Sequence, residues 1–387
     1  RCVRLKRKSL VQDRPENSKQ GRSAIIAGID GGDHVERDLE ELRLLLANLD
    51  VGGAGSVLQA RRGPDPSSYI GSGKVSEIAE IMKAQGADLL VIDARLTPGQ
   101  LANIKGVVSG DVWDRPLVIM KIFEKRAHTS EAKLQIELAK CRYEIPFLKG
   151  LGKQMSRPGG GLGTRGPGET EFERHRRKLE RRVRSINREL ETVRKRRRNH
   201  RERRKRAGFM SVALAGYTNS GKSTLLQTLS RDSGIVAEDR LFSTLDPTVR
   251  RVSLPSGKTV LVSDTVGFIR RLPPDLLAAF RATLEEVAAA DLLLVVLDGS
   301  QKDYREDLAA VEDVLASIEA GSTPRIIVLN KTDLMNEAQI ESACDKLQGE
   351  GNMVFPVSAL KGDNLGDLLR KITVFMEESQ HGEWKKC

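Results

Sequence analysis

The chain has 387 residues, of which 39% are hydrophobic and 30% are charged; it is typical of a folded globular protein and too long for one ordinary domain core. No run of about 18 apolar residues occurs, so the sequence excludes a helix that spans a membrane. The net charge is +11, but residues 173–206 hold 18 Lys/Arg and 5 Asp/Glu, a local charge of +13 that leaves −2 for the rest. This concentrated cationic segment predicts a polyanionic partner.

The first part of the chain is expected to form a small α/β domain. Residues 1–22 are basic and polar and are expected to be a flexible N-terminal segment. Between residues 23 and 125, strand-like runs occur at 24–30, 51–60, 88–93 and 116–123, and helix-like stretches lie between them at 35–49, 74–87 and 97–108. This alternation predicts a largely parallel sheet.

Residues 126–207 change to a heptad pattern, which predicts an antiparallel helical hairpin. Apolar residues are spaced 4, 3, 4 and 3 apart in two segments: Leu134, Leu138, Cys141, Ile145 and Leu148 in the first, and Leu179, Val183, Ile186, Leu190 and Val193 in the second. The tip of the hairpin is expected at loop 149–168. Pro146 is expected to kink or break the end of the first helix. Beyond Val193 the second helix is strongly basic and has no apolar face of its own.

From residue 208 to 378 the alternation of strands and helices returns, and residues 379–387 form a tail. Strand-like runs occur at 210–216, 250–254, 258–264, 291–298, 324–330 and 352–358, and helical stretches at 222–231, 275–290, 304–320, 335–349 and 364–378. Six strands with intervening helices predict a doubly wound α/β domain.

A phosphate-binding loop is predicted where the first strand of this domain ends. The sequence fits G-x-x-x-x-G-K-[ST], with an apolar strand before it and a helix after it; its residues are Gly216, Tyr217, Thr218, Asn219, Ser220, Gly221, Lys222 and Ser223. Glycines let backbone N–H groups converge on phosphate oxygens. Lys222 is expected to reach the β- and γ-phosphates, and the Ser223 hydroxyl to bind Mg²⁺.

Three later motifs at strand ends complete a predicted GTP site. They are Asp264-Thr265-Val266-Gly267, Asn330-Lys331-Thr332-Asp333 and Ser358-Ala359-Leu360. Asp264 is expected to hold the magnesium through water, and the Gly267 N–H to meet the γ-phosphate. Asp333 can accept two hydrogen bonds from guanine that adenine cannot donate, and Asn330 is expected to tie the loops together. Ligands bind at this edge of open α/β sheets.

Two features bear on hydrolysis. In the stretch Phe242-Ser243-Thr244-Leu245-Asp246, Thr244 is the candidate second magnesium ligand, or else part of an ordinary turn before Pro247. Lys222, Thr244 and Gly267 are therefore the expected catalytic residues. Phe268 stands where many GTPases carry a glutamine that orients water, so hydrolysis is expected to be slow until a partner supplies or orders a catalytic group.

Two other glycine-rich stretches resemble nucleotide motifs. Gly71-Ser72-Gly73-Lys74 lacks the leading glycine and the magnesium-binding hydroxyl, so it is either a structural or RNA-backbone element or a second nucleotide site. Residues 161–166 read GLGTRG, but no strand precedes them, so a dinucleotide site is excluded. Loop 149–168 has eight glycines, four cations and no acid, and is either a plain connector or a cationic finger that enters folded RNA. The candidate RNA-binding residues are Arg157, Gly159, Gly160, Gly161, Arg165, Arg174, Arg176 and Arg177.

The motifs together resemble the HflX family of ribosome-associated GTPases. The resemblance rests on YIGSGK (69–74), GGGLGTRGPGETEFERHRR (159–177), GYTNSGKS (216–223), FSTLDPT (242–248), DTVGFIRRLP (264–273) and NKTD (330–333). It implies a small α/β domain, a helical hairpin whose tip reaches towards the peptidyl-transferase region, and a GTPase domain. Ser220 stands where the family commonly has Ala.

The resemblance implies a GTPase that uses Mg²⁺ and GTP, binds the large ribosomal subunit and its RNA, and splits or rescues stalled ribosomes. The rival hypothesis is a GTP-switched RNA-binding assembly or remodelling factor, with a second nucleotide site in the first domain. We expect a monomer that binds no DNA. The four cysteines are far apart in sequence, which suits a reducing compartment: the bacterial cytoplasm, or else a chloroplast stroma or mitochondrial matrix.

Overall fold

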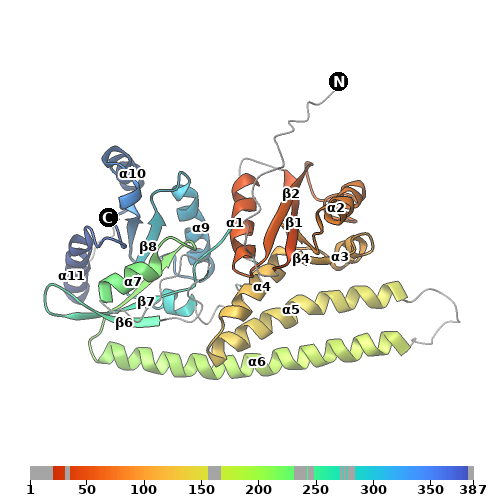
Figure 1. The fold of residues 1–387 in the computed structure, drawn as a ribbon. Coiled ribbons are helices and arrows are strands. Elements are labelled where there is room, and N and C mark those ends of the chain that lie inside the picture. Colours follow the sequence, from red (N-terminus) through yellow and green to blue (C-terminus); the bar gives the residue numbers. More distant parts are fainter. Residues whose placement is uncertain are drawn as a thin grey trace. The chain divides into compact units, whose positions relative to one another are not determined.

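The computed structural model describes residues 21–30, 35–155, 167–230, 242, 248–270, 273, 276 and 284–381 (Figure 1). The chain packs into two compact units. Residues 1–122 and 145–175 form the N-terminal unit, and residues 123–144 and 176–387 form the C-terminal unit. The chain passes from one unit to the other after residues 122, 144 and 175, each time inside a helix. Within the described ranges, every helix is too short or too polar to cross a bilayer.

The N-terminal unit contains a four-stranded sheet in the order β2-β1-β3-β4, with every pair parallel. Its strands are β1 (Ser23–Asp30), β2 (Gly52–Ala60), β3 (Leu89–Ile92) and β4 (Asp111–Asp114), and its helices are α1 (Val35–Ala47), α2 (Ser72–Gln85) and α3 (Pro98–Lys105), followed by α4 (Arg115–Arg126). Figure 1 shows α1 on one side of the sheet and α2 and α3 on the other. The apolar core beneath α2 and α3 includes Ile25, Ile78, Ile92 and Ile104.

The strand predicted at 116–123 is wrong, because these residues form most of α4. The fourth strand is instead β4, which begins five residues earlier than expected and is only four residues long. The Asp114 carboxylate, 1% exposed, accepts the N–H of Leu117 at 3.0 Å and so satisfies the first turn of α4. A short apolar run that is buried on most sides has no visible period, so the sequence pattern does not separate helix from strand here.

The helical hairpin consists of α5 (Ser130–Met155) and α6 (Pro167–Arg206). In the C-terminal unit the predicted seam is formed, with Leu138 packed against Ile186 and Leu190, and Leu134 and Val183 beside them. The sequence predicts that Pro146 kinks or breaks the end of the first helix; Pro146 does not break it, since α5 continues to Met155. The predicted tip therefore begins later than residue 149, and residues 156–166 lie outside the described part of the chain.

A bidentate ion pair holds the two helices in register. Arg182 Nε and Nη2 donate to Glu137 Oε1 and Oε2 at 2.6 and 2.7 Å. The Arg182 guanidinium lowers the pKa of the Glu137 carboxyl below its usual value. The pair therefore stabilises the fold fully above the ordinary glutamate pKa, and this contribution is lost as the pH falls through the lowered pKa.

Replacing Glu137 by Gln is expected to lower the thermal unfolding midpoint at pH 7 by about 1–3 °C, the size usual for an exposed pair. The difference from the wild type should shrink as the pH falls below about 4.3, because the wild-type carboxyl then takes up a proton. Calorimetry of both proteins between pH 3 and 7 measures this. A difference that stayed constant over the whole range would contradict the assignment.

The C-terminal unit contains a six-stranded sheet in the order β10-β9-β8-β5-β7-β6, parallel except for β6. Its strands are β5 (Ser211–Gly216), β6 (Thr248–Ser253), β7 (Thr259–Asp264), β8 (Leu292–Asp298), β9 (Arg325–Asn330) and β10 (Val354–Pro356). Helices α7 (Lys222–Ser230) and α11 (Leu365–His381) cover one face. Helices α9 (Tyr304–Ser317) and α10 (Glu337–Gly349), with the helical residues 284–288, cover the other. This doubly wound arrangement confirms the predicted fold class.

Candidate functional site

The loop between β5 and α7 is shaped to enclose an anion. Gly221 has φ +93°, and a Cβ atom there would lie 2.2 Å from Asn330 Nδ2, so only glycine fits. Asn219 adopts φ +62°, in the left-handed region. Ser220 is 1% exposed and Thr218 6% exposed, so the loop is packed into the domain. Its backbone N–H groups gather at the N-terminus of α7, where anions bind favourably.

Lys222 lies inside this loop. Its ammonium Nζ donates to the carbonyl oxygens of Gly216 at 3.1 Å and Tyr217 at 2.7 Å. Burial lowers the pKa of Lys222 to about 8, although the charge of Asp264 acts in the opposite direction. Burying a charged ammonium that contacts only carbonyl oxygens costs desolvation free energy. An anion bound in the loop would offset this cost.

Ser223 and Asp264 meet beside the loop. The Ser223 hydroxyl donates to Asp264 Oδ2 at 2.6 Å, although the two residues are 41 positions apart. Asp264 is 2% exposed at the end of β7, and Thr265 beside it donates its hydroxyl to the carbonyl of Leu214 at 2.6 Å. The structure thus brings together a hydroxyl and a carboxylate that the sequence assigned to one metal.

The chain after Asp264 is bound directly to the loop. Phe268 N–H donates to the carbonyl of Gly216 at 3.0 Å, and Thr218 N–H donates to the carbonyl of Phe268 at 2.7 Å. Gly267 lies so close that a Cβ atom there would be 3.0 Å from Lys222 Nζ. The Phe268 ring is 2% exposed in the apolar core, so this side chain does not reach the site.

The motifs at the ends of β9 and β10 form one hydrogen-bonded network. Asn330 Nδ2 donates to the carbonyl of Ser220 at 2.8 Å, and its Oδ1 accepts the N–H of Ala359 at 2.9 Å. Ser358 Oγ donates to Asp333 Oδ1 at 2.7 Å and accepts the N–H of Lys361 at 3.1 Å. The predicted tie through Asn330 is therefore present, and it joins three motifs that are far apart in sequence.

Two contacts near the site were not predicted, one made by Asp298 and the other by Tyr217 of the phosphate loop. Asp298, at the end of β8, pairs through Oδ2 with Lys331 Nζ at 2.8 Å and fixes the lysine stem beside Asp333. Its position at the carboxyl end of a predicted strand was the available signal. Tyr217 Oη accepts the N–H of Arg270 at 2.7 Å and so adds a third contact between the loop and the chain after Gly267. No sequence pattern indicates this contact.

The remaining predicted site residues are placed only in part. Val266 and Thr332 are buried near the motifs to which they belong, whereas Leu360 is 77% exposed. Phe242 is 2% exposed, and its ring meets that of Phe123 edge-on, with centroids 4.6 Å apart. Ser243, Thr244, Leu245 and Asp246 lie outside the described residues, so the candidate magnesium threonine stays a prediction.

The candidate RNA-binding residues are also described in part. Arg174 and Arg177 are exposed on α6, and Arg176 Nε lies 3.3 Å from Glu180 Oε1. Arg157, Gly159, Gly160, Gly161 and Arg165 lie outside the described residues. At the other glycine-rich stretch, Lys74 Nζ pairs with Glu77 at 2.6 Å, and Val75 is 1% exposed. This lysine is directed to its own helix α2, which favours the structural interpretation.

Three family models match the chain. Residues 36–124 match a model described as GTP-binding GTPase N-terminal, residues 126–204 one described as GTP-binding GTPase middle region, and residues 211–331 one described as 50S ribosome-binding GTPase. The last match covers the phosphate loop, the motif at Asp264 and the first two residues of the motif at Asn330.

Among known proteins, the chain is 45% identical over 320 residues to "GTPase HflX" of Caldanaerobacter subterraneus subsp. tengcongensis, covering 83% of this chain and 74% of that protein. It is 40% identical to "GTPase HflX" of Escherichia coli strain K12, covering 89% of this chain and 80% of the relative. Among solved structures, SsGBP in complex with GDP aligns with a TM-score of 0.51 at 26% identity, over 92% of this chain and 99% of SsGBP.

Proposed function

Because the chain belongs to the HflX family of GTPases, and so binds and hydrolyses GTP, we propose that it acts on the large ribosomal subunit and couples hydrolysis to the splitting or rescue of stalled ribosomes. The proposed compartment is the bacterial cytoplasm, or an organelle that holds its own ribosomes. The family model that describes a 50S ribosome-binding GTPase supports the proposal. The observation that carries it is the outward face of α6.

That face presents a row of cations to solvent. Its exposed cations include Lys178, Arg184, Arg188, Lys195 and Arg196, which take part in none of the ion pairs of the described part of α6. At 1.5 Å per residue the row runs for about 27 Å along α6; Arg184, Arg188 and Lys195 lie opposite the seam with α5, and Lys178 and Arg196 lie about 100° round the helix from it. A long, rigid, unneutralised row of this kind suits the phosphates of folded RNA.

In this proposal the three motif loops hold GTP. Lys222 contacts the β- and γ-phosphates, the Gly267 N–H meets the γ-phosphate, and the Asp333 carboxylate accepts the guanine N1–H and N2–H₂ groups. Asn330, Ser358 and Asp298 orient these groups through the hydrogen bonds and the ion pair described above.

The donor set fits magnesium. Ser223 Oγ and Asp264 Oδ2 are hard oxygen ligands 2.6 Å apart, next to the place of the phosphates. Bound there with Thr244, Mg²⁺ would neutralise charge that develops on the phosphate oxygens. Ser223 and Thr244 would bind the ion directly, and Asp264 through water. The buried Phe268 cannot orient an attacking water, so hydrolysis is expected to be slow without the ribosome.

The test is binding to purified large subunits, measured by co-sedimentation with a non-hydrolysable GTP analogue at several salt concentrations. Replacing the five cations of the outward row by Gln should weaken binding at least about tenfold. It should also reduce the slope of log K against log salt by about four, because each phosphate contact contributes about 0.9 or somewhat less. An unchanged slope would exclude this face of α6 from the interface.

A matched control removes five exposed cations elsewhere: Lys83, Lys105, Lys258, Lys346 and Arg370. This variant has the same net charge and should bind like the wild type. Light scattering of assembled ribosomes then separates the two functions. Splitting with GTP supports the lead proposal, whereas binding to the large subunit without splitting favours the assembly factor. Deleting residues 157–168 tests the cationic finger in the same assays.

A further inference from the structure

The second helix of the hairpin continues past its apolar seam as a row of inward-facing arginines. Arg194, Arg197 and Arg201 follow Leu190 at helical spacing, on the side of α6 that the seam occupies. Arg197 Nη2 lies 2.7 Å from Glu131 Oε2, at the start of α5. Ion pairs thus replace apolar contacts in the last turns of α6. Some of the cations that give residues 173–206 their charge of +13 therefore form ion pairs within the protein.

The two other arginines pair with a segment of the G domain. Arg194 Nε lies 3.4 Å from Glu285 Oε1, and Arg201 Nη1 donates to Glu286 Oε1 at 2.9 Å. The second pair is the less exposed, with side chains 24% and 13% accessible. Solvent therefore screens it less than an ordinary surface pair.

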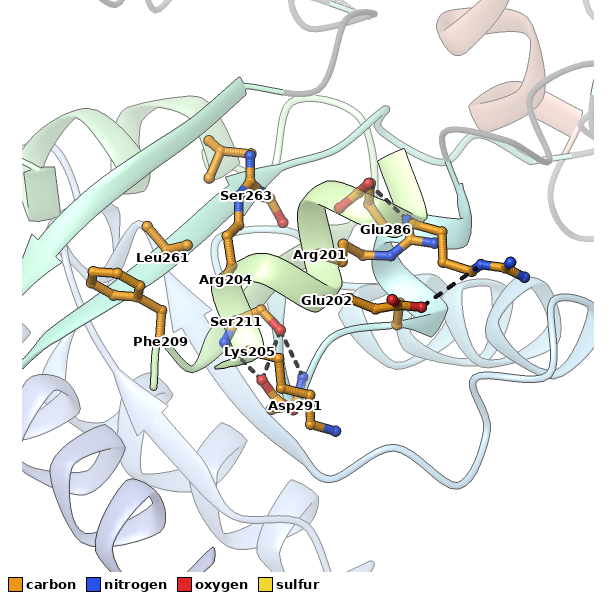
Figure 2. A pocket seen from close by; sticks show the side chains of 13 residues that line it. Arg201, Glu202, Arg204, Lys205, Phe209, Ser211, Leu261, Ser263, Glu286 and Asp291 are labelled. Atoms are coloured by element: carbon orange, nitrogen blue, oxygen red, sulfur yellow. Dashed lines mark hydrogen bonds and ion pairs between the residues drawn. The ribbon is translucent and has the colours of Figure 1, made fainter. Parts of the chain in front are cut away.

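Figure 2 shows this pair beside a pocket of about 160 Å³ at the base of α6. The pocket is lined by Ser211 at the start of β5, by Leu261 in β7, and by Asp291 just before β8. The Asp291 carboxylate accepts the N–H and the hydroxyl of Ser211, both at 2.8 Å. The ion pairs therefore lie at the opposite ends of the strands from the phosphate loop.

The glutamates belong to the segment that follows Gly267. Residues 284–288 are helical, and Leu284 and Val287 are buried in the same apolar cluster as Phe268. At its beginning this segment is bound to the phosphate loop through the backbone of Phe268. In residues 284–288, Leu284 and Val287 face the apolar core, and Glu285 and Glu286 face the arginines of α6.

We propose that Arg194 and Arg201 are positioning residues for GTP hydrolysis, which hold the helical residues 284–288 through Glu285 and Glu286. Hydrolysis requires the Gly267 backbone to be fixed against the γ-phosphate. Leu284 and Val287 pack in the same apolar cluster as Phe268, whose backbone is bound to the phosphate loop, so holding residues 284–288 fixes the position of Phe268 and of the adjacent Gly267. The proposal rests on the GTPase activity of the family and not on the ribosome.

The experiment is single-turnover hydrolysis by the isolated full-length protein, present in excess over GTP so that slow turnover is still measured. The double variant Arg194→Glu/Arg201→Glu should hydrolyse GTP about tenfold more slowly, the effect of about 1.4 kcal/mol on the barrier. Its affinity for GDP should stay within about twofold of the wild type, because the γ-phosphate contact is absent there. Adding Glu285→Arg/Glu286→Arg should restore hydrolysis to within about twofold.

The control is the Arg182–Glu137 pair, which lies in the same hairpin away from the G domain. The variant Arg182→Glu should lower the thermal midpoint, yet leave single-turnover hydrolysis within about twofold of the wild type. This comparison separates a positioning role from general loosening of the hairpin.

Two results would overturn the proposal. One is unchanged hydrolysis in Arg194→Glu/Arg201→Glu. The other is slow hydrolysis by the double variant that the two added substitutions, Glu285→Arg and Glu286→Arg, fail to restore. The double variant would then be damaged structurally. No ribosome enters these measurements, so a failure to bind or split ribosomes leaves their outcome unaffected.

Discussion

Replacing Asp333 by Asn is expected to abolish the preference for guanine nucleotides and to weaken GDP binding by about 100-fold or more. In the proposed site both carboxylate oxygens accept hydrogen bonds from the base, and bonds to a charged group contribute about 1.5–3 kcal/mol each. An amide can offer only one oxygen and places an N–H₂ group against the N2–H₂ of guanine. Xanthine has an oxygen at that position, so XDP should bind the variant better than GDP.

Titration of fluorescent GDP and XDP into both proteins measures this exchange of specificity. Ser358→Ala is the matched control. It removes the hydroxyl that donates to Asp333 Oδ1 at 2.7 Å but leaves the carboxylate in place. It should weaken GDP binding by about tenfold, the value of one such hydrogen bond, and keep the preference for guanine. Retained preference in Asp333→Asn would refute the assignment of the base site.

Replacing Gly267 by Ala is expected to reduce GTP hydrolysis by about 100-fold or more, with little change in GDP affinity. The added methyl carbon would lie 2.9 Å from Thr218 Cγ2 and 3.0 Å from Lys222 Nζ, closer than real Cβ atoms approach their neighbours. The chain must then move away from the phosphate loop. A displacement of about 1 Å at a reacting centre can cost 100-fold in rate.

Gly366→Ala provides the comparison, because a Cβ atom there meets nothing within 4 Å and α11 already has helical geometry. It should hydrolyse GTP like the wild type. Single-turnover rates and GDP affinities of the three proteins decide the matter. If Gly267→Ala lost GDP and GTP binding equally, its effect would be on the loop as a whole and not on the γ-phosphate position.

Motifs whose chemistry requires particular residues could be read from the sequence. The phosphate loop, Asp264 and Asn330 each follow an apolar run, and strand ends at one edge of a parallel sheet must lie together. The hydrogen bonds of Asn330 to the carbonyl of Ser220 and from the N–H of Ala359 show that the spacing along the chain was sufficient to predict the network.

The direction of side chains cannot be predicted from the sequence where apolar residues show no helical or strand period. The run at 116–123 is apolar on most sides, so it could be a strand or a helix until Asp114 is seen to accept the N–H of Leu117 in the first turn of α4. Similarly, the arginines after Val193 look alike in the sequence. Whether one pairs with Glu286, as Arg201 does, or faces water, as Arg196 does, depends on its place around the helix.

Helix α6 packs against α5 through its apolar seam and also pairs with Glu285 and Glu286. These two sets of contacts restrict how its length can vary in related proteins. Each residue turns an α-helix by about 100°, so one inserted residue rotates everything after it relative to everything before it. Between Ile186 in the seam and Arg201 at the G domain, such an insertion would point the inward arginines away from Glu285 and Glu286. An insertion of seven residues restores the same face but moves the arginines by about 10.5 Å along the axis, so it also breaks these contacts. We therefore expect the number of residues between Ile186 and Arg201 to be constant in related proteins.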